Sequence, residues 1–269
     1  MAIRIITDSA SDITQVEAAA WGVQVLPLRT IFGQEEFLDG VTIDHEAFYQ
    51  KLIESDVLPT TSQLSPFQYE EPFRQAAEAG DEVVCITLSS KLSGCYQSAS
   101  IAAEDLPVVL VDSCNVTVGE RLLVERAVQL RDQGLSAQEI GQQLETEKNQ
   151  IRLIALLDTL EYLKKGGRIS SAAALAGSLL SIKPVIAVEH GEIAILGKAR
   201  GSKNGGINFE MPYCLAYSGL SDALLRKYIA DSQSLYSGRA EHLPVSTIGS
   251  TIGTHAGPGA IAVAFFSNR

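Results

Sequence analysis

Residues 3–12 read Ile3-Arg4-Ile5-Ile6-Thr7-Asp8-Ser9-Ala10-Ser11-Asp12. The apolar run from Ile3 to Thr7 is typical of a buried strand, and the polar residues after it indicate a loop. A helix is expected next, over Ile13 to Trp21, with Asp12 and Gln15 as its capping pair. Strand, loop and helix in this order form the repeating unit of α/β proteins.

The same unit recurs along the first half of the chain. Further strands are expected over residues 23–32, 82–88 and 107–111. Asp44 is expected to cap a helix over 46–54, and Ser65-Pro66 to begin another; the remaining helices are expected over 93–104 and 116–133 and from about 136. This alternation favours a parallel sheet covered on both faces by helices.

The pattern changes at Ile151. A strand is expected over 151–157, a short helix over 159–165, an alanine-rich helix over 170–180, and a hairpin of strands over 183–188 and 192–196. A mobile loop is expected over 197–206. We therefore predict an α/β fold with a parallel-sheet domain over residues 1–150 and a mixed α+β domain over 151–269.

Composition narrows the function classes. Lys and Arg total 21 and Asp and Glu total 32, so the net charge is −11, which disfavours binding to nucleic acid or anionic membranes. No apolar run approaches the roughly twenty residues that span a bilayer, and no signal peptide is expected. The cysteines form no CxxC pair and indicate a reducing, cytoplasmic location: Cys85, Cys95, Cys114 and Cys214.

Ligands of open parallel sheets bind beyond the carboxyl ends of the strands. Three expected loops lie there, and they carry Asp8, Ser93 and Asp112 among other polar residues. Ser93 stands at an expected helix start that attracts anions; it could be a simple N-cap, but Gly94 after it leaves the backbone open to a ligand and favours binding. Asp12 is more typical of a helix cap than of a catalyst.

Two other segments are candidates for anion binding. Thr60-Thr61-Ser62 either forms a turn between prolines or offers hydroxyls to a ligand. The glycine-rich stretch from Ile248 to Gly259 predicts a tight backbone turn whose N–H groups, hydroxyls and imidazole converge on an anion. His255, between two glycines, is favoured as a ligand contact over a core histidine.

Enzyme motifs fit poorly. The chain has neither a G-x-x-x-x-G-K-[ST] phosphate loop nor a G-x-G-x-x-G after a strand. His45-Glu46 lacks the second histidine of a zinc helix, and a metal site is not expected. The run from Gly249 to Gly253 has the spacing of a nucleophile elbow. It carries a central threonine, however, and is expected before a glycine turn instead of between strand and helix.

Taken in order, these segments resemble the DegV family of bacterial lipid-binding proteins. The resemblance covers nearly the whole chain and rests on residues 7–9 with Asp12, 59–63 with 65–66, 92–94, 96–99, 111–113, 165–169, 183–184 and 253–259.

The resemblance implies a long-chain fatty acid buried between two domains, with no cofactor and no catalysis by this chain. Its carboxylate would be held by Thr61, Ser93 and His255, with Thr60 and Ser62 as neighbours. In several relatives the acid is presented to a separate ATP-dependent kinase and becomes an acyl phosphate. The family's phosphate or partner contacts would correspond to Arg168, Arg200 and Asp8.

Other functions remain open at this point. An esterase-like hydrolase would use Ser93 or Thr251 with His255 and a carboxylate, either Asp8 or Asp112. A phosphotransferase would use Asp8 at the end of the first strand. A regulatory sensor that changes shape with lipid is the third class.

Overall fold

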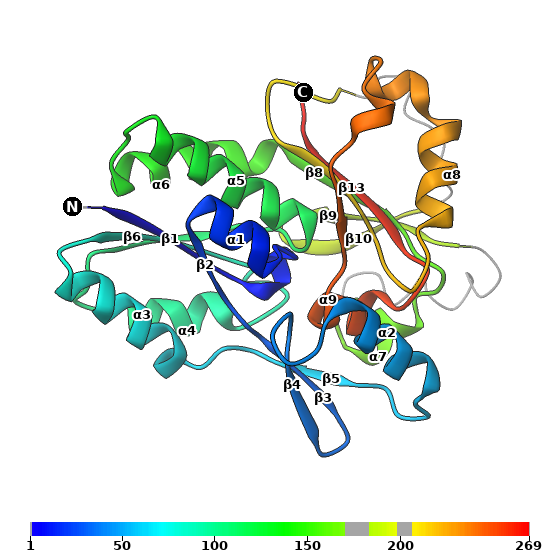
Figure 1. Ribbon diagram of the computed structural model, residues 1–269, viewed down its shortest axis with the longest axis horizontal. Coiled ribbons are helices and arrows are strands. Elements are labelled where there is room, and N and C mark those ends of the chain that lie inside the picture. Colours follow the sequence, from blue (N-terminus) through cyan, green and yellow to red (C-terminus); the bar gives the residue numbers. More distant parts are fainter. Residues whose placement is uncertain (1, 170–182, 198–205, 269) are drawn as a thin grey trace.

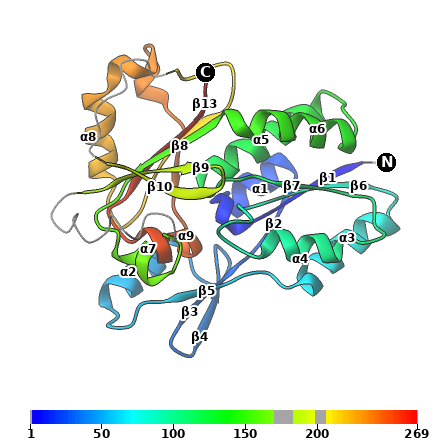
Figure 2. The ribbon, with the colours of Figure 1, turned by 180° about the vertical axis from the view of Figure 1, so that it is seen from behind.

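A computed structural model describes residues 2–169, 183–197 and 206–268 of the chain (Figure 1). The first half builds a parallel sheet with the strand order β2-β1-β6-β7. Its strands are β1 (Ile3–Asp8), β2 (Val23–Leu26), β6 (Glu82–Thr87) and β7 (Val108–Asp112). Its helices are α1 (Gln15–Trp21), α3 (Pro66–Glu78), α4 (Cys95–Ala102), α5 (Val118–Asp132) and α6 (Ala137–Glu147). Both views place α5 and α6 on one face of this sheet and α3 and α4 on the other (Figure 2). The predicted α/β class is confirmed.

The second half builds a six-stranded sheet with the order β10-β9-β8-β13-β11-β12. Neighbouring strands of this sheet run antiparallel, except β11 and β12, which run parallel. The strands are β8 (Ile151–Leu156), β9 (Val185–Glu189), β10 (Glu192–Gly197), β11 (Tyr213–Tyr217), β12 (Val245–Thr247) and β13 (Ile261–Phe266). The helices in this half are α7 (Glu161–Lys165), α8 (Ala223–Asp231) and α9 (Ser250–Ala256). A second, mixed sheet is therefore confirmed, whereas the boundary at residue 150 stays a prediction.

A small third sheet was not expected. It has the antiparallel order β4-β3-β5, made of β3 (Arg29–Phe32), β4 (Glu35–Leu38) and β5 (Thr60–Ser62), and α2 (His45–Glu54) follows β4. The strand expected over 23–32 is broken at Pro27, which has no backbone N–H to donate. The segment Thr60–Ser62, for which a turn was one interpretation, is a strand.

Helix α5 joins the two larger sheets. It contacts β1 and β6 of the parallel sheet and also β8, β11 and β13 of the mixed sheet. Its buried residues include Val118, Glu120, Leu122, Leu123 and Val124, so several of its faces are covered. Only its later residues, such as Gln129 and Asp132, reach solvent. The apolar core is accordingly one cluster with members from both sheets.

Two local predictions are wrong. Asp12 does not cap α1, because its backbone is in the left-handed region at φ 54° and ends the 3₁₀ turn η1 (Ser9–Ser11). Thr14 caps α1 instead, in a capping box with Glu17. The glycine-rich stretch is not a turn throughout, since Ser250–Ala256 forms helix α9.

The remaining 3₁₀ segments are η2 (Lys148–Gln150), η4 (Gln233–Tyr236) and η5 (Ala240–His242). The helix expected over 170–180, Arg200 and nearly all of the 197–206 loop lie outside the described residues. Within the described ranges, every helix is too short or too polar to cross a membrane.

Candidate functional site: a cavity with one polar end

A cavity lies between the loops at the carboxyl ends of β2, β6 and β7 and the mixed sheet. It contains about 870 Å³ of space free of protein atoms, counted out to its open mouth. Its apolar wall comes mainly from the mixed sheet and its connections: Leu153, Ala155, Leu157, Ile186, Val188, Ile193, Ala260 and Ala262.

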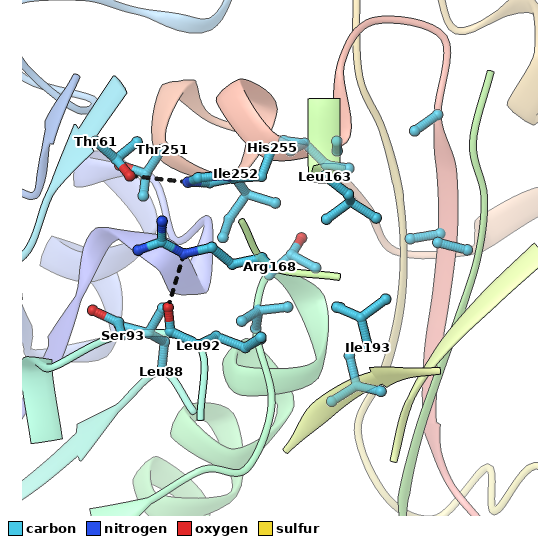
Figure 3. Close-up of a pocket in the computed structure, with 18 of the residues that line it drawn as sticks. Thr61, Leu88, Leu92, Ser93, Leu163, Arg168, Ile193, Thr251, Ile252 and His255 are labelled. Atoms are coloured by element: carbon cyan, nitrogen blue, oxygen red, sulfur yellow. Dashed lines mark hydrogen bonds between the residues drawn. The ribbon is translucent and has the colours of Figure 1, made fainter. Parts of the chain in front are cut away.

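Polar side chains gather at one end of the cavity. In Figure 3 the imidazole of His255, the hydroxyl of Thr61 and the guanidinium of Arg168 lie on one side, whereas Leu163 and Ile193 lie on the other. Ser93 lies near the guanidinium in this view. The cavity therefore has the two-ended character that suits an elongated amphipathic molecule.

Helix α9 supplies His255, Thr251 and Ile252 to this cavity. Its N-terminal amides are capped by a residue distant in sequence, Asp39. One carboxylate oxygen of Asp39 accepts from the amide and the hydroxyl of Ser250, both at 2.8 Å, and the other accepts from the Thr251 amide at 3.3 Å. The cap therefore depends on tertiary structure, which a local sequence pattern does not show.

His255 is bonded to one cavity residue and keeps one ring nitrogen without a partner. Its Nε2 lies 2.9 Å from Oγ1 of Thr61, and its buried Nδ1 has no hydrogen-bond partner among the described residues. Burial, aided by the positive charge of Arg168, lowers the pKa of His255 to about 4. The imidazole is therefore neutral near pH 7, and a proton on Nε2 would leave the Thr61 hydroxyl free to donate to a ligand.

Arg168 brings a positive charge to the polar end. Its Nε donates to the carbonyl of Leu92 at 3.1 Å and its Nη1 to the carbonyl of Gly166 at 2.7 Å. In the part of the chain that the structure describes, Arg168 has no carboxylate partner. Two neutral carbonyls fix the guanidinium and leave its charge uncompensated, which suits an anionic ligand.

Two hydroxyls complete the polar end. The Thr251 hydroxyl is buried and has no partner within the described ranges, and Thr251 lines the cavity. Ser93 donates only to Sγ of Cys95 at 3.3 Å, a weak acceptor that a carboxylate can replace. The sequence named Thr251 as a possible nucleophile and, with the other hydroxyls of residues 248–259, as part of an anion site, but its lack of a partner is visible only with α9 in place.

The structure brings together most of the predicted site residues. Thr61, Ser62, Ser93, Arg168 and His255 all line the cavity. Asp8 is fully buried away from it, and its two oxygens accept from the amides of Ala10 and Leu88, each at 3.0 Å. Its proposed contact with phosphate or a partner is a prediction that this geometry does not support.

The residues of the alternative hydrolase site are not arranged for catalysis. His255 bonds to Thr61 through Nε2, and its Nδ1 is not held by a carboxylate of the described chain. The Oδ1 of Asp112 accepts from the amides of Ser90 and Cys114. The nucleophile-elbow segment follows strand β12 and, from Ser250 on, forms the start of helix α9, contrary to expectation, but Thr251 has no base bonded to it among the described residues.

The carboxyl groups of Asp8, Asp12 and Glu120 are buried. Burial raises the pKa of Asp8 to about 7 and that of Asp12 to about 8, and the pKa of Glu120 is well above its usual range for the same reason. One oxygen of Asp12 accepts from the Gly249 amide at 2.8 Å, and the other has no partner among described residues.

Together, the fold and the cavity define an α/β protein in which a parallel sheet and a mixed sheet enclose an apolar pocket with a polar end. The family model described as "Uncharacterised protein, DegV family" matches residues 2–206. The chain belongs to the DegV family.

Known relatives cover almost the full length. A DegV domain-containing protein of Caldanaerobacter subterraneus is 35% identical, with 98% of each chain covered. The solved structure of a DegV family protein from Thermus thermophilus, described as binding fatty acid, has a TM-score of 0.84 at 32% identity and covers 99% of this chain and 100% of its own. A stearic-acid-binding protein from Eubacterium ventriosum has a TM-score of 0.83 at 26% identity, with 98% of each chain covered.

The raised carboxyl pKa values predict a pH effect on stability. Unfolded chains ionise Asp8 and Asp12 near pH 4, whereas the folded chain keeps their protons up to about pH 7 and 8. The folded state thus binds more protons, and the free energy of unfolding falls as pH rises to 8. The lowered pKa of His255 makes the free energy of unfolding rise with pH, but only below pH 6.5.

Between pH 6.5 and 8, the titration of His255 therefore does not contribute to the slope. Asp12→Asn keeps the acceptor for Gly249 and removes the ionisation, so its slope should be smaller by up to about 1.4 kcal/mol per pH unit. Urea denaturation at both pH values measures this slope. The exposed Asp132→Asn serves as a charge-matched control. A slope in Asp12→Asn equal to that of the wild type would contradict the prediction.

Proposed function

We propose that this chain binds a long-chain fatty acid in the cavity, with the carboxylate at the polar end and the alkyl tail against the mixed sheet. The observation that carries the proposal is that the Arg168 charge, without a carboxylate partner in the described chain, and the unpartnered Thr251 hydroxyl both line a cavity whose remaining wall is mostly apolar. The fatty acids bound by related DegV proteins support it.

The tail accounts for affinity in this proposal. Burial of about fifteen methylenes contributes on the order of 12 kcal/mol before ordering costs are subtracted. The lining alanines Ala155, Ala260 and Ala262 lie on or beside β8 and β13, where short side chains leave space for an alkyl chain.

The head group accounts for orientation. A carboxylate accepts hydrogen bonds only, and burying it without donors would be costly. The donors available are the hydroxyls of Thr61, Ser93 and Thr251 and the free N–H groups of Arg168, with His255 orienting Thr61. A neutral His255 fits this arrangement, because the charge that balances the carboxylate comes from Arg168.

Presentation of the acid to an ATP-dependent kinase is the second part of the proposal. The chain has no recognisable ATP-binding motif, so a phosphoryl donor must come from a partner. A second, more polar hollow shares Leu92, Ser93, Arg168 and Ile193 with the cavity and adds Ser90, Lys91 and Gly94. In this proposal a partner would approach the head group from this hollow. A cytoplasmic location, in keeping with four free cysteines, belongs to the same proposal.

Solvent extraction of freshly purified protein tests the binding directly. We expect mass spectrometry of the extract to contain a long-chain fatty acid at up to one equivalent per chain. Protein that is always empty, and that also fails to bind added fatty acid, would reject the proposal.

Thr251→Val tests the head-group donors. The change removes one hydroxyl that would bond the carboxylate, so fatty-acid affinity should fall about 5- to 30-fold. Titration with a fluorescent fatty acid measures it. Thr254→Val is the matched control, because Thr254 is buried in the same helix and donates to the Ser250 carbonyl without lining the cavity. Equal losses in the two variants would mean that the effect is structural.

Incubation with ATP tests whether phosphoryl transfer to the bound acid requires a separate kinase. The purified chain loaded with fatty acid should form no acyl phosphate when hydroxylamine trapping is used for detection. Product formed by this chain alone, at a rate that increases with its concentration, would show that it carries out phosphoryl transfer itself.

A further inference from the structure

His45, the first residue of α2, makes an unusual pair of hydrogen bonds. Its Nδ1 lies 3.0 Å from the carbonyl oxygen of Ile248, and its Nε2 lies 2.8 Å from the carbonyl oxygen of Gly219. Carbonyl oxygens only accept hydrogen bonds. A neutral imidazole has one N–H, whereas an imidazolium has two, so only the charged ring satisfies both contacts.

The two carbonyls lie just beyond the carboxyl ends of the paired parallel strands β12 and β11, where the Ile248 amide also donates to the Tyr217 carbonyl at 2.9 Å. Ile248 lies just before the helix, whose first residue is Ser250. Gly219 follows Ser218, and Ser218 holds the chain that leaves α9. Its hydroxyl donates to the Gly257 carbonyl at 2.7 Å and accepts from the Ala260 amide at 2.8 Å. One ring thus contacts the segment that enters the helix carrying Thr251 and His255, and also the Ser218–Gly219 segment that bonds the chain leaving this helix.

The packing around His45 fixes the ring and the helix together. Its ring centroid lies 4.8 Å from that of Tyr49 and 5.5 Å from that of Tyr217, both in edge-like orientations. Gly253 in the middle of α9 lies so close to Tyr49 and Phe48 that a Cβ there would overlap them. The views agree that α2 and α9 lie side by side (Figures 1 and 2).

We infer that His45 is a positioning residue for the proposed fatty-acid site, and that its imidazolium form holds α9 in place by bridging Ile248, which leads into the helix, and the Ser218–Gly219 segment, which bonds the chain leaving it. Deprotonation removes one donor and cuts the bridge at one end. Fatty-acid affinity then declines as His45 loses its proton. The affinity part of this inference rests on the proposed function, whereas the bridge itself does not.

Other ionisable groups surround the ring and share in any pH profile. Asp44 and Glu46 belong to its own helix, as does Tyr49, whose pKa lies well above its usual value because of burial. Tyr217 comes from β11. Asp12 and Asp39 hold the first amides of α9. The test must therefore separate His45 from these groups.

The bridge is tested without ligand by NMR of the imidazole nitrogens between pH 5.5 and 8.5. The chain has four histidines, and the signals missing from His45→Gln identify His45. We expect its doubly protonated form at low pH, and backbone amide signals of residues 250–256 that shift with the same midpoint as its titration. A His45 that stays neutral, or that titrates while the α9 amides do not respond, would overturn the inference. The pH titration itself uses the wild-type chain, and the variant serves only to assign the His45 signals.

The effect on binding is tested by fatty-acid titration across the same pH range. Wild-type affinity should fall about fivefold with the midpoint found by NMR, the loss expected for one hydrogen bond. His45→Gln should begin at the weaker affinity and lack this step, while His242→Gln, at an exposed histidine of η5, should behave as wild type. If His45→Gln keeps the wild-type affinity and pH profile, the inference fails. If no variant and no wild-type sample binds fatty acid while the NMR result holds, the proposed function fails and the bridge stands.

Discussion

The carboxylate of Asp39 is the interaction on which the site depends. It is buried, with 3% of its surface exposed, and accepts from the Ser9 hydroxyl, the Ser250 amide and hydroxyl and the Thr251 amide. A buried carboxylate without such donors would cost several kcal/mol. Its bonds therefore bring the loop after β1 and the start of α9 to one place, and α9 in turn sets Thr251 and His255 on the cavity.

Much of the architecture could be predicted from local patterns. The alternation of apolar runs and amphipathic helices located most elements of the parallel sheet, and Asp44 and Ser65 begin helices as predicted. The third sheet was missed because β5 has only three residues, all polar, and pairs with β3 thirty positions earlier. Such pairing leaves no periodic signal in the sequence.

The residues at the polar end of the cavity were predicted better than helix α9 and the Asp39 cap that hold some of them in place. Thr61, Ser93, Arg168 and His255 were named through a family resemblance and from glycines and hydroxyls near expected loops, and all line the cavity. The α9 helix was mistaken for a turn because four glycines argue against a helix and its cap, Asp39, lies more than two hundred residues away in sequence. Gly249 and Gly253 are explained by close packing, since a Cβ would meet Asp39 at the first and overlap Tyr49 at the second.

Helix α5 has a consequence for how the cavity exchanges its contents. Because this one helix is packed against both larger sheets, rotating them apart as rigid lobes would expose its buried leucines and valines to water. The described core thus opposes hinge opening. Within the described chain, ligand exchange is therefore expected to use small movements of short elements that line the cavity, such as α7 and the β9–β10 hairpin, around a frame that stays closed.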